Sequence, residues 1–369
     1  MRLVLVIAHL RRAGCERVAS ILASSWAQAG HQVSLLTLDH GETPAYFVDP
    51  AVTLRNLGLL ADSRNLLAAV SRNIGRVRAL RRAIRKARPD TVISFMDAIN
   101  VVTLLATRRL GCPVVVCEQT DPGIFEIGLV WKILRFLVYP FADMLVCPTR
   151  GALAGFQKTI PVSGCVIPNP IDVPPDSGSS QRSPQAGFNL VAMGRLVPEK
   201  GFDLLLLAYA RIAGRHSDSV LTIYGEGPLL YDLEAQAKSL GLEQRVRFAG
   251  AVADPFARLR AADLFVFSSR TEAFGMALAE AMACGLPVIS FDCPSGPREI
   301  IRAGVDGVLV PANDVAALAS ALDRLMSDPQ ERRRLAARAP EISVRLSIKR
   351  VLHLWQRLFD RLAAPAAAP

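Results

Sequence analysis

One stretch decides the fold expected of this chain: Arg270-Thr271-Glu272-Ala273-Phe274-Gly275-Met276-Ala277-Leu278-Ala279-Glu280-Ala281-Met282-Ala283-Cys284-Gly285-Leu286-Pro287-Val288-Ile289-Ser290. The short apolar run just before it, residues 264–267, predicts a buried strand. The Ala-, Leu- and Met-rich segment over residues 275–284 predicts a helix. Glu272 precedes this helix and Glu280 lies within it, so two carboxylates lie on either side of the start of a helix.

The start of the predicted helix suits an anionic ligand. The first backbone N–H groups of a helix have no partner within it, and the helix dipole favours negative charge there. We therefore expect a phosphate at Phe274, Gly275, Met276 and Ala277. At a rise of about 1.5 Å per residue, the two carboxylates would lie roughly 10 Å apart. That span fits a ligand with hydroxyl groups on both sides of a phosphate.

Length and composition indicate two domains. The chain has 369 residues, of which 51% are hydrophobic, enough for two cores. No run of 18 uncharged apolar residues occurs, so no membrane-spanning helix is expected. The apolar residues 1–10 are too short for a signal sequence and predict a first strand. The seven cysteines form no C-x-x-C pair, which is typical of a reduced, cytoplasmic protein.

The formal net charge of +10 is concentrated in the first half of the chain. Residues 1–168 contain 20 Lys and Arg against 11 Asp and Glu, whereas residues 169–369 contain 23 against 22. Much of the excess lies in one stretch: Arg72, Arg76, Arg78, Arg81, Arg82, Arg85, Lys86 and Arg88. An anionic partner is expected for this half. No helix-turn-helix, zinc or aromatic RNA-binding motif accompanies the charge, so we expect no nucleic acid.

Strands and helices alternate along both halves. Predicted strands of the first half cover residues 2–8, 32–38, 91–94, 113–117 and 144–147; those of the second cover 189–193, 220–224, 246–248, 264–267, 287–290 and 308–310. Alternation of this kind predicts an α/β fold with parallel sheets. We assign residues 1–168 and 188–345 to two Rossmann-like doubly wound domains. A Pro-, Ser- and Gly-rich linker covers residues 169–187.

Residues 346–369 are predicted to form a final helix and a tail. Val351, Trp355 and Leu358 fall on one stripe of this helix, which we expect to return to the first domain. Ligands of doubly wound sheets bind outside the carboxyl ends of the strands. A cleft between the carboxyl edges of the two domains is therefore the expected site.

Three motifs follow one another in the second half: Gly194-Arg195-Leu196-Val197-Pro198-Glu199-Lys200-Gly201, Tyr224-Gly225-Glu226-Gly227-Pro228, and Glu272 with Glu280 eight residues later. Together they resemble the retaining glycosyltransferases of family 4, which have the GT-B fold of two Rossmann-like domains facing each other across a cleft. The segments 94–100, 118–122 and 295–301 are similar to a subgroup that adds N-acetylgalactosamine or related sugars to polyprenyl-diphosphate-linked oligosaccharides. The resemblance implies an acceptor-binding first domain and a nucleotide-sugar-binding second domain.

The resemblance assigns roles in the second domain. Arg195 and Lys200 would hold the diphosphate and stabilise its charge as it leaves; as alternatives, both could be solvated loop charges. Glu280 would bind the ribose and Glu272 the transferred sugar, although Glu272 could also act only as a helix-capping acid. Gly225 either lets the backbone approach the nucleotide or only forms a turn. Further donor contacts are predicted at Gly194, Glu226 and the four residues that open the helix.

The first domain carries weaker signals. Gly14 opens the helix after the first strand, but Ala13 stands where relatives have a second glycine, so a donor contact by this loop rests on Gly14 alone. Asp97 and Glu118 follow strands and are predicted to orient acceptor hydroxyls, or else to satisfy loop backbone. Gln119 stands where some relatives have a histidine, which excludes a general base there.

The resemblance implies metal-independent transfer with retention, from a nucleotide sugar to a lipid-diphosphate-linked glycan. A UDP-linked donor is expected, with UDP-GalNAc as one candidate. No D-x-D, H-E-x-x-H or Cys/His cluster indicates a metal, and no cofactor is expected. Alternatives are a GDP-mannose-dependent transferase, an epimerase-like or phosphorylase-like GT-B enzyme, and a non-catalytic nucleotide-binding protein. A dinucleotide dehydrogenase would need G-x-G-x-x-G after a first strand, which is missing.

The basic stretch is also the predicted membrane contact. Aromatic and apolar residues at 131, 134, 136, 137 and 139 are mixed with Lys132 and Arg135. Basic and apolar side chains together favour attachment to an anionic bilayer, although a solvated helix face is the common alternative for the charges. We expect a peripheral protein on the inner face of the cytoplasmic membrane.

Overall fold

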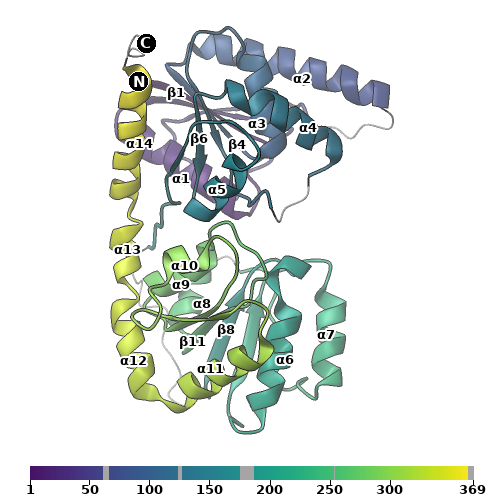
Figure 1. Ribbon diagram of the computed structural model, residues 1–369, viewed down its shortest axis with the longest axis vertical. Coiled ribbons are helices and arrows are strands. Elements are labelled where there is room, and N and C mark those ends of the chain that lie inside the picture. Colours follow the sequence, from purple (N-terminus) through teal and green to yellow (C-terminus); the bar gives the residue numbers. More distant parts are fainter. Residues whose placement is uncertain (61–65, 124–126, 175–186, 253, 365–369) are drawn as a thin grey trace. The chain divides into compact units, whose positions relative to one another are not determined.

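Strands that are mostly apolar form two separate parallel sheets in the computed structural model (Figure 1). The structure describes residues 1–60, 66–123, 127–174, 187–252 and 254–364. The chain divides into two compact units, Met1–Pro170 together with the segment from Ile348, and Ile171–Ser347. Most of the linker predicted over residues 169–187 lies outside the described residues.

The sheet of the first unit has seven strands in the order β3-β2-β1-β4-β5-β6-β7. Their bounds are β1 (Arg2–Ile7), β2 (Gln32–Thr37), β3 (Thr53–Asn56), β4 (Thr91–Phe95), β5 (Val114–Cys117), β6 (Met144–Cys147) and β7 (Gly164–Val166). From β1 the chain adds strands on one side of the sheet, and from β4 it adds them on the other side. The topological switch point therefore lies between β1 and β4.

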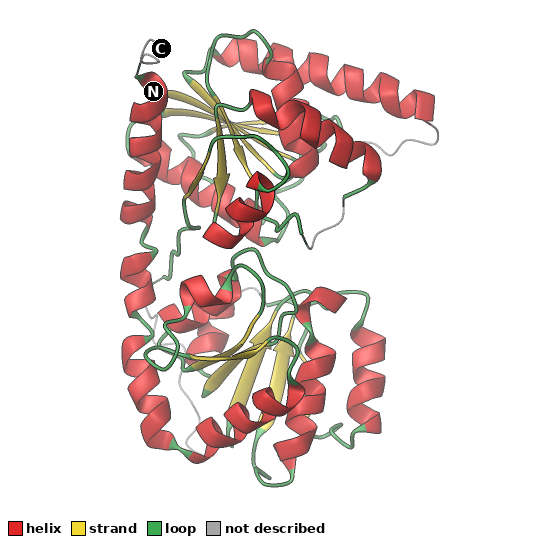
Figure 2. Cartoon of the chain, viewed as in Figure 1, coloured by secondary structure: helices red, strands yellow, loops and turns green. Residues whose placement is uncertain are grey.

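Helices cover both faces of this sheet (Figure 2). They are α1 (Gly14–Gln28), α2 (Leu66–Ala87), α3 (Asp97–Thr107), α4 (Leu129–Val138), the 3₁₀ turn η1 (Tyr139–Phe141), α5 (Arg150–Gln157) and, from the end of the chain, α14 (Ile348–Ala363). The apolar stripe of α14 packs on α1, where the rings of Trp355 and Trp26 meet edge to face with centroids 5.3 Å apart. The C-terminal helix is therefore part of the first unit's core.

The second unit repeats the arrangement with six strands in the order β10-β9-β8-β11-β12-β13. They are β8 (Asn189–Met193), β9 (Val220–Tyr224), β10 (Val246–Phe248), β11 (Leu264–Phe267), β12 (Val288–Asp292) and β13 (Val308–Pro311). Its helices are η2 (Pro198–Lys200), α6 (Phe202–Ala213), α7 (Leu230–Ser239), α8 (Pro255–Arg260), α9 (Met276–Ala283), α10 (Pro297–Ile300), α11 (Val315–Ser327), α12 (Pro329–Arg338) and α13 (Glu341–Arg345).

These two sheets confirm the predicted fold class, two Rossmann-like doubly wound domains. In the second unit, β8 pairs directly with β11, although seventy residues separate them in the chain. The loop after β8 and the loop after β11 therefore leave the sheet side by side at its carboxyl edge. These loops hold the Gly194–Gly201 motif and Glu272.

Candidate active site

Three hydrogen bonds to backbone carbonyls join the loop after β8 to the loop after β11. The amide of Arg270 donates to the carbonyl of Glu199 at 2.8 Å, and the Ser268 hydroxyl donates to the carbonyl of Lys200 at 2.9 Å. The Arg270 guanidinium donates to the carbonyl of Pro198, also at 2.8 Å. Because the backbone of each loop is fixed by the other, the side chains that they carry have defined relative positions.

Arg270 adds an ion pair to this junction, which the sequence interpretation had not assigned. Two nitrogens of its guanidinium donate to the two carboxylate oxygens of Asp203, in the first turn of α6, at 2.7 and 2.6 Å. Burial alone would raise the pKa of Asp203, but the hydrogen bond and charge of Arg270 hold it below its usual range. A two-point pair of this kind fixes orientation as well as distance.

Lys200 and Glu272 meet at this junction. The Lys200 ammonium forms an ion pair with a carboxylate oxygen of Glu272, and the two side chains are only 20% and 19% exposed. The ammonium also lies 5.8 Å from the centre of the Phe267 ring. Two residues that are far apart in sequence, one predicted to hold a diphosphate and the other a sugar, thus lie in contact at the switch point.

The environment of Glu272 is completed by the loop after β12. The amide of Gly296 donates to the carbonyl of Glu272 at 3.0 Å. Cys293, in the same loop, is fully buried, and burial together with the nearby Glu272 carboxylate raises the pKa of its thiol to about 12. The thiol is therefore neutral at physiological pH and adds no charge beside Lys200 and Glu272.

Helix α9 starts next to this pair. Gly275 precedes it with a φ of 107°, a conformation that side chains rarely adopt, so the chain can enter the helix only through glycine here. Met276 and Ala277 follow, half-buried, in the first turn, whereas Phe274 buries its side chain and offers only backbone to a ligand. Glu280 is 6% exposed on the same helix. A carboxylate this buried needs polar partners, so it is not an ordinary surface residue.

The loop after β8 packs tightly on the loop after β9. The amide of Leu196 donates to the carbonyl of Glu226 at 2.9 Å. Gly225 has a φ of 142°, and a Cβ placed there would lie 1.8 Å from the carbonyl oxygen of Gly194. This close approach explains Gly225 without a ligand, and a donor contact by Gly194, Gly225 or Glu226 stays a prediction. Arg195 is exposed, and its side chain pairs with no carboxylate in the described part of the chain.

Asp97 and Glu118 lie close together in the first unit, at the carboxyl ends of β4 and β5. Glu118 is fully buried and accepts hydrogen bonds from the Tyr139 hydroxyl and, at 3.4 Å, from the Asn100 amide. Burial raises the pKa of Glu118 to about 7, with the Asp97 charge acting in the same direction and Tyr139 opposing it. Asp97 is half-buried at the start of α3, so of the two only Asp97 reaches the surface.

Gly14 is exposed as the first residue of α1, as its predicted position requires. Two residues later, in the same turn, Glu16 lies against His9, with Nδ1 of the imidazole 3.2 Å from a carboxylate oxygen. Both residues follow β1, at the switch point of the first sheet. No group of His, Cys, Asp or Glu side chains suited to a metal ion occurs among the described residues of either unit.

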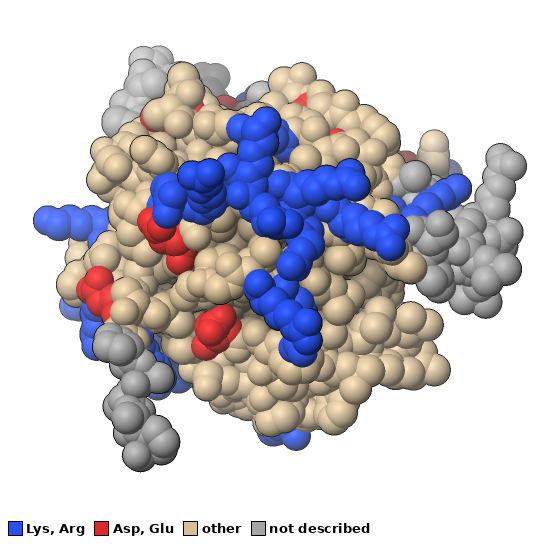
Figure 3. Space-filling view, turned by 90° about the horizontal axis from the view of Figure 1, so that it is seen from above, with Lys and Arg blue, Asp and Glu red and all other residues tan. Residues whose placement is uncertain are grey.

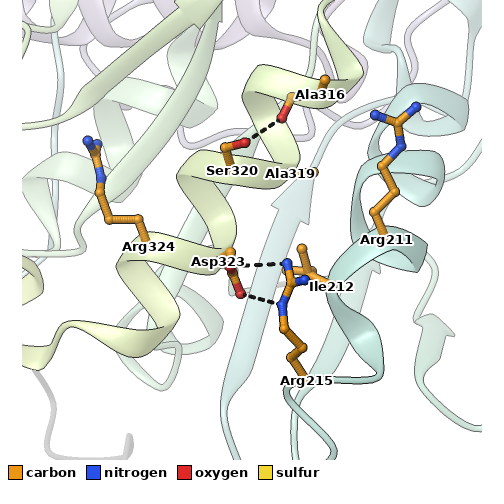
Figure 4. A pocket seen from close by; sticks show the side chains of 8 residues that line it. All are labelled: Arg211, Ile212, Arg215, Ala316, Ala319, Ser320, Asp323 and Arg324. Atoms are coloured by element: carbon orange, nitrogen blue, oxygen red, sulfur yellow. Dashed lines mark hydrogen bonds and ion pairs between the residues drawn. The ribbon is translucent and has the colours of Figure 1, made fainter.

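A hollow in the second unit lies elsewhere. It is lined by residues of α6, α11 and the turn after α6, and Figure 4 shows Arg215 of that turn paired with Asp323 of α11. Arg211 lies in the last turn of α6, about 14 Å along the helix from its start beside Lys200, and Arg215 follows the helix. The hollow therefore belongs to the opposite edge of the sheet and is not part of the candidate site.

Comparisons with known proteins cover both units. The family model "Glycosyl transferase 4-like domain" matches residues 13–170, and "Glycosyl transferases group 1" matches residues 179–342. The N-acetylgalactosamine-N,N'-diacetylbacillosaminyl-diphospho-undecaprenol 4-alpha-N-acetylgalactosaminyltransferase of Campylobacter jejuni is 30% identical over 66% of this chain and 69% of its own length. A second alpha-1,4-N-acetyl-D-galactosaminyltransferase of that organism, named for a PP-undecaprenol glycan, is 26% identical over 97% of this chain and 98% of its own.

Other known proteins resemble this chain in fold, or over part of its length. An exopolysaccharide phosphotransferase of Streptomyces coelicolor is 32% identical, but the match covers 77% of this chain and only 30% of that longer protein. The Anabaena protein HepE, solved in complex with UDP, superimposes with a TM-score of 0.77 at 19% identity, over 98% of this chain and 100% of that one. The two parallel sheets and the family models that match both units identify the family. The chain belongs to the glycosyltransferases of the GT-B fold, which join a family 4-like domain to a group 1 domain.

Proposed function

We propose that this glycosyltransferase moves a hexose or hexosamine from a UDP-linked donor to a lipid-diphosphate-linked glycan, with retention of configuration and without a metal ion, in the assembly of a cell-surface polysaccharide or glycan. The contact between Lys200 and Glu272 carries the proposal. The proposal is supported because an ammonium group, suited to a diphosphate, lies there beside a carboxylate, suited to sugar hydroxyls. UDP-GalNAc is the first donor to test, because two relatives are named as N-acetylgalactosaminyltransferases.

The donor would be held along the loops that follow β8 and β11. An ammonium group has three donors; since Lys200 uses one on Glu272, it can offer others to phosphate oxygens. Arg195, which is exposed on the same loop, would supply a second cation, and the backbone at the start of α9 would supply N–H donors. Glu280, buried further along α9, would accept hydrogen bonds from the ribose hydroxyls. Gly194, Gly225 and Glu226 would line the nucleotide end.

The proposed reaction needs no protein base. The bond between the anomeric carbon and the diphosphate oxygen breaks, and the acceptor hydroxyl oxygen bonds to the same face of that carbon. The hydroxyl proton passes to an oxygen of the departing phosphate, so UDP leaves with the bonding electrons. Lys200 and Arg195 stabilise the negative charge that develops on UDP, which is the role that a metal ion has in other transferases.

The acceptor would be bound by the first unit. Asp97 reaches the surface at the carboxyl edge of the sheet and is the residue that we assign to acceptor hydroxyls. Glu118 is buried under Tyr139 and Asn100, so we assign it to positioning the loop that follows β5. A lipid-linked acceptor would keep the enzyme at the inner face of the cytoplasmic membrane as a peripheral protein.

A donor panel tests the proposal. The purified protein would be incubated in EDTA with UDP- and GDP-linked sugars and a polyprenyl-diphosphate-linked glycan, and the released nucleotide measured. We expect release of UDP from one UDP-sugar, dependent on the acceptor and unaffected by EDTA. Release of GDP from GDP-mannose alone would contradict the donor assignment, and loss of activity in EDTA would contradict metal independence. Interconversion of free UDP-sugars without transfer would identify an epimerase.

A further inference from the structure

Helix α4 of the first unit exposes its apolar side. Five large apolar residues recur at helical spacing on its outer face, and all are more than half exposed: Leu129, Val130, Ile133, Phe136 and Leu137. Phe141, in the turn that follows, is 52% exposed as well. A surface helix of a water-soluble domain normally turns such a stripe toward the core. An apolar patch of this kind is instead typical of an interaction surface.

The inner side of the same helix is held by polar groups. Arg135 is 7% exposed, lies over the Phe156 ring with 5.1 Å from its guanidinium carbon to the ring centre, and offsets the charge of Glu118. Tyr139, directly after α4, is fully buried and donates to Glu118. Trp131 and Leu134 complete the contact with the core. These contacts fix the side of α4 that faces the core. The opposite side, with its apolar residues, is therefore left exposed.

Basic side chains border the apolar face. The guanidinium of Arg108, at the end of α3, lies 3.9 Å from the centre of the Phe141 ring, and the next residue, Arg109, is exposed. Arg81 of α2 donates to the carbonyls of Ala106 and Arg108 at 2.8 and 2.7 Å, which ties α2 to the same end of α3. The exposed Arg78, Arg82 and Arg85 continue along α2, and Figure 3 shows Lys and Arg gathered on the face of this unit seen from above, with few acidic residues.

We infer that the outer face of α4, together with Phe141, inserts into the interface of an anionic lipid bilayer, while Arg108, Arg109 and the exposed arginines of α2 contact the lipid headgroups. A ten-residue helix is about 15 Å long, too short to cross a bilayer and suited to lie along its surface. None of the described helices is long and apolar enough to span a membrane. Apolar side chains bordered by arginines match a surface with an apolar interior and anionic headgroups better than they match a protein partner.

This inference changes the residues assigned from the sequence. Trp131, Leu134 and Tyr139 were expected at the membrane, but they pack against the core. Phe136 and Leu137 are exposed, and Leu129, Val130 and Ile133 join them. The Arg81 guanidinium donates to backbone carbonyls at the end of α3. On α2 we therefore assign the headgroup contacts to the exposed Arg78, Arg82 and Arg85.

Vesicle binding tests the inference without any substrate. The full-length protein would be floated with phosphatidylcholine vesicles that contain about one third phosphatidylglycerol. Ile133→Glu and Phe136→Glu should each lower the partition coefficient about tenfold, because each places a charge in the apolar layer. Tyr231→Glu is the matched control, since Tyr231 is 80% exposed on α7 of the second unit and should leave binding unchanged. Thermal melting would verify that each variant is folded.

The outcomes separate lipid from protein partners. Arg109→Glu should lower binding to anionic vesicles and leave the weak binding to pure phosphatidylcholine unchanged. Equal vesicle binding by the wild type, Ile133→Glu and Phe136→Glu would overturn the inference. So would a wild-type dimer that becomes monomeric in these two variants, because a second copy would then cover α4. The inference rests on the proposed function, whose acceptor is a lipid; vesicle binding without any sugar transfer would support the docking surface and contradict the proposed function.

Discussion

Lys200 and Glu272 form an ion pair between two loops that leave neighbouring strands of the second sheet. Seventy-one residues separate them, yet both loops are fixed by backbone hydrogen bonds at the switch point. The pair is mostly buried, so a change at either residue also changes the environment of the other. Variants at Glu272 must therefore be measured for both sugar transfer and nucleotide binding.

Replacing Glu272 should separate these two measurements. Glu272→Ala should lower the transfer rate by on the order of 100-fold, because the sugar loses a hydrogen-bond partner near the reacting carbon. UDP affinity should change by no more than a few-fold, since Lys200 remains and is released toward the phosphates. Glu199→Ala is the matched control: Glu199 is an exposed acid one residue before Lys200. Transfer by Glu272→Ala at the parental rate would remove Glu272 from the site.

The Arg270–Asp203 pair should contribute stability that depends on pH. The pKa of Asp203 is held below its ordinary value of 3.8 in the folded protein. A carboxyl group with a lowered pKa stabilises the fold above its unfolded pKa, and this contribution is lost as pH falls. Asp203→Asn should lower Tm by about 1–3 °C at pH 7, since the pair is partly exposed. The difference between variant and wild type should shrink below about pH 4; a constant difference down to pH 3 would exclude this ion pair as its source.

Gly225 should be intolerant of any side chain. A Cβ at this position would lie 1.8 Å from the Gly194 carbonyl oxygen, and the φ of 142° is strained for other residues. We expect Gly225→Ala to lower Tm by about 10 °C or to prevent soluble expression. Gly214→Ala is the comparison, because Gly214 has a helical φ of −64° and no neighbouring atom within 4 Å of an added Cβ. Equal melting temperatures for both variants would contradict the loop contact.

Glu118 should make the protein less stable as pH rises. Its pKa is raised from 4.5 to about 7, chiefly by burial. An acid with a raised pKa favours the fold below its unfolded pKa, and this contribution is lost as pH rises through the folded pKa. Relative to wild type, Glu118→Gln should therefore gain Tm between pH 5 and 8, by on the order of 5 °C. Thermal melts across this range measure the gain, and parallel curves for the two proteins would show that Glu118 is charged throughout.

The sequence predicted the parallel sheets well because most strands are buried on both faces and are apolar throughout. β3 and β7 were not predicted. Residues 53–56 of β3 are half-exposed at the sheet edge and include Arg55 and Asn56, and β7 has only three residues. A short edge strand that carries polar side chains has no periodicity from which it can be recognised.

The sequence predicts charged residues for the candidate site, but it does not predict the contacts that they make. Local motifs located Arg195, Lys200, Glu272 and Glu280, because each lies in a loop or helix with a distinctive local pattern. The Arg270–Asp203 pair and the burial of Glu118 depend on contacts between segments far apart in sequence, for which a single sequence has no periodic signal. The interpretation of Gly225 was open for the same reason: the atom that requires glycine belongs to another loop.

The stereochemistry of the product tests the central claim most directly. The protein would be supplied with a UDP-sugar that is α-linked to its diphosphate and with a polyprenyl-diphosphate-linked glycan, in EDTA, and the anomeric proton of the product would be observed by NMR. The account predicts transfer of the sugar with an α-linkage, together with one UDP released per sugar transferred. A β-linked product, or no transfer from any UDP-sugar by a folded protein, would contradict it.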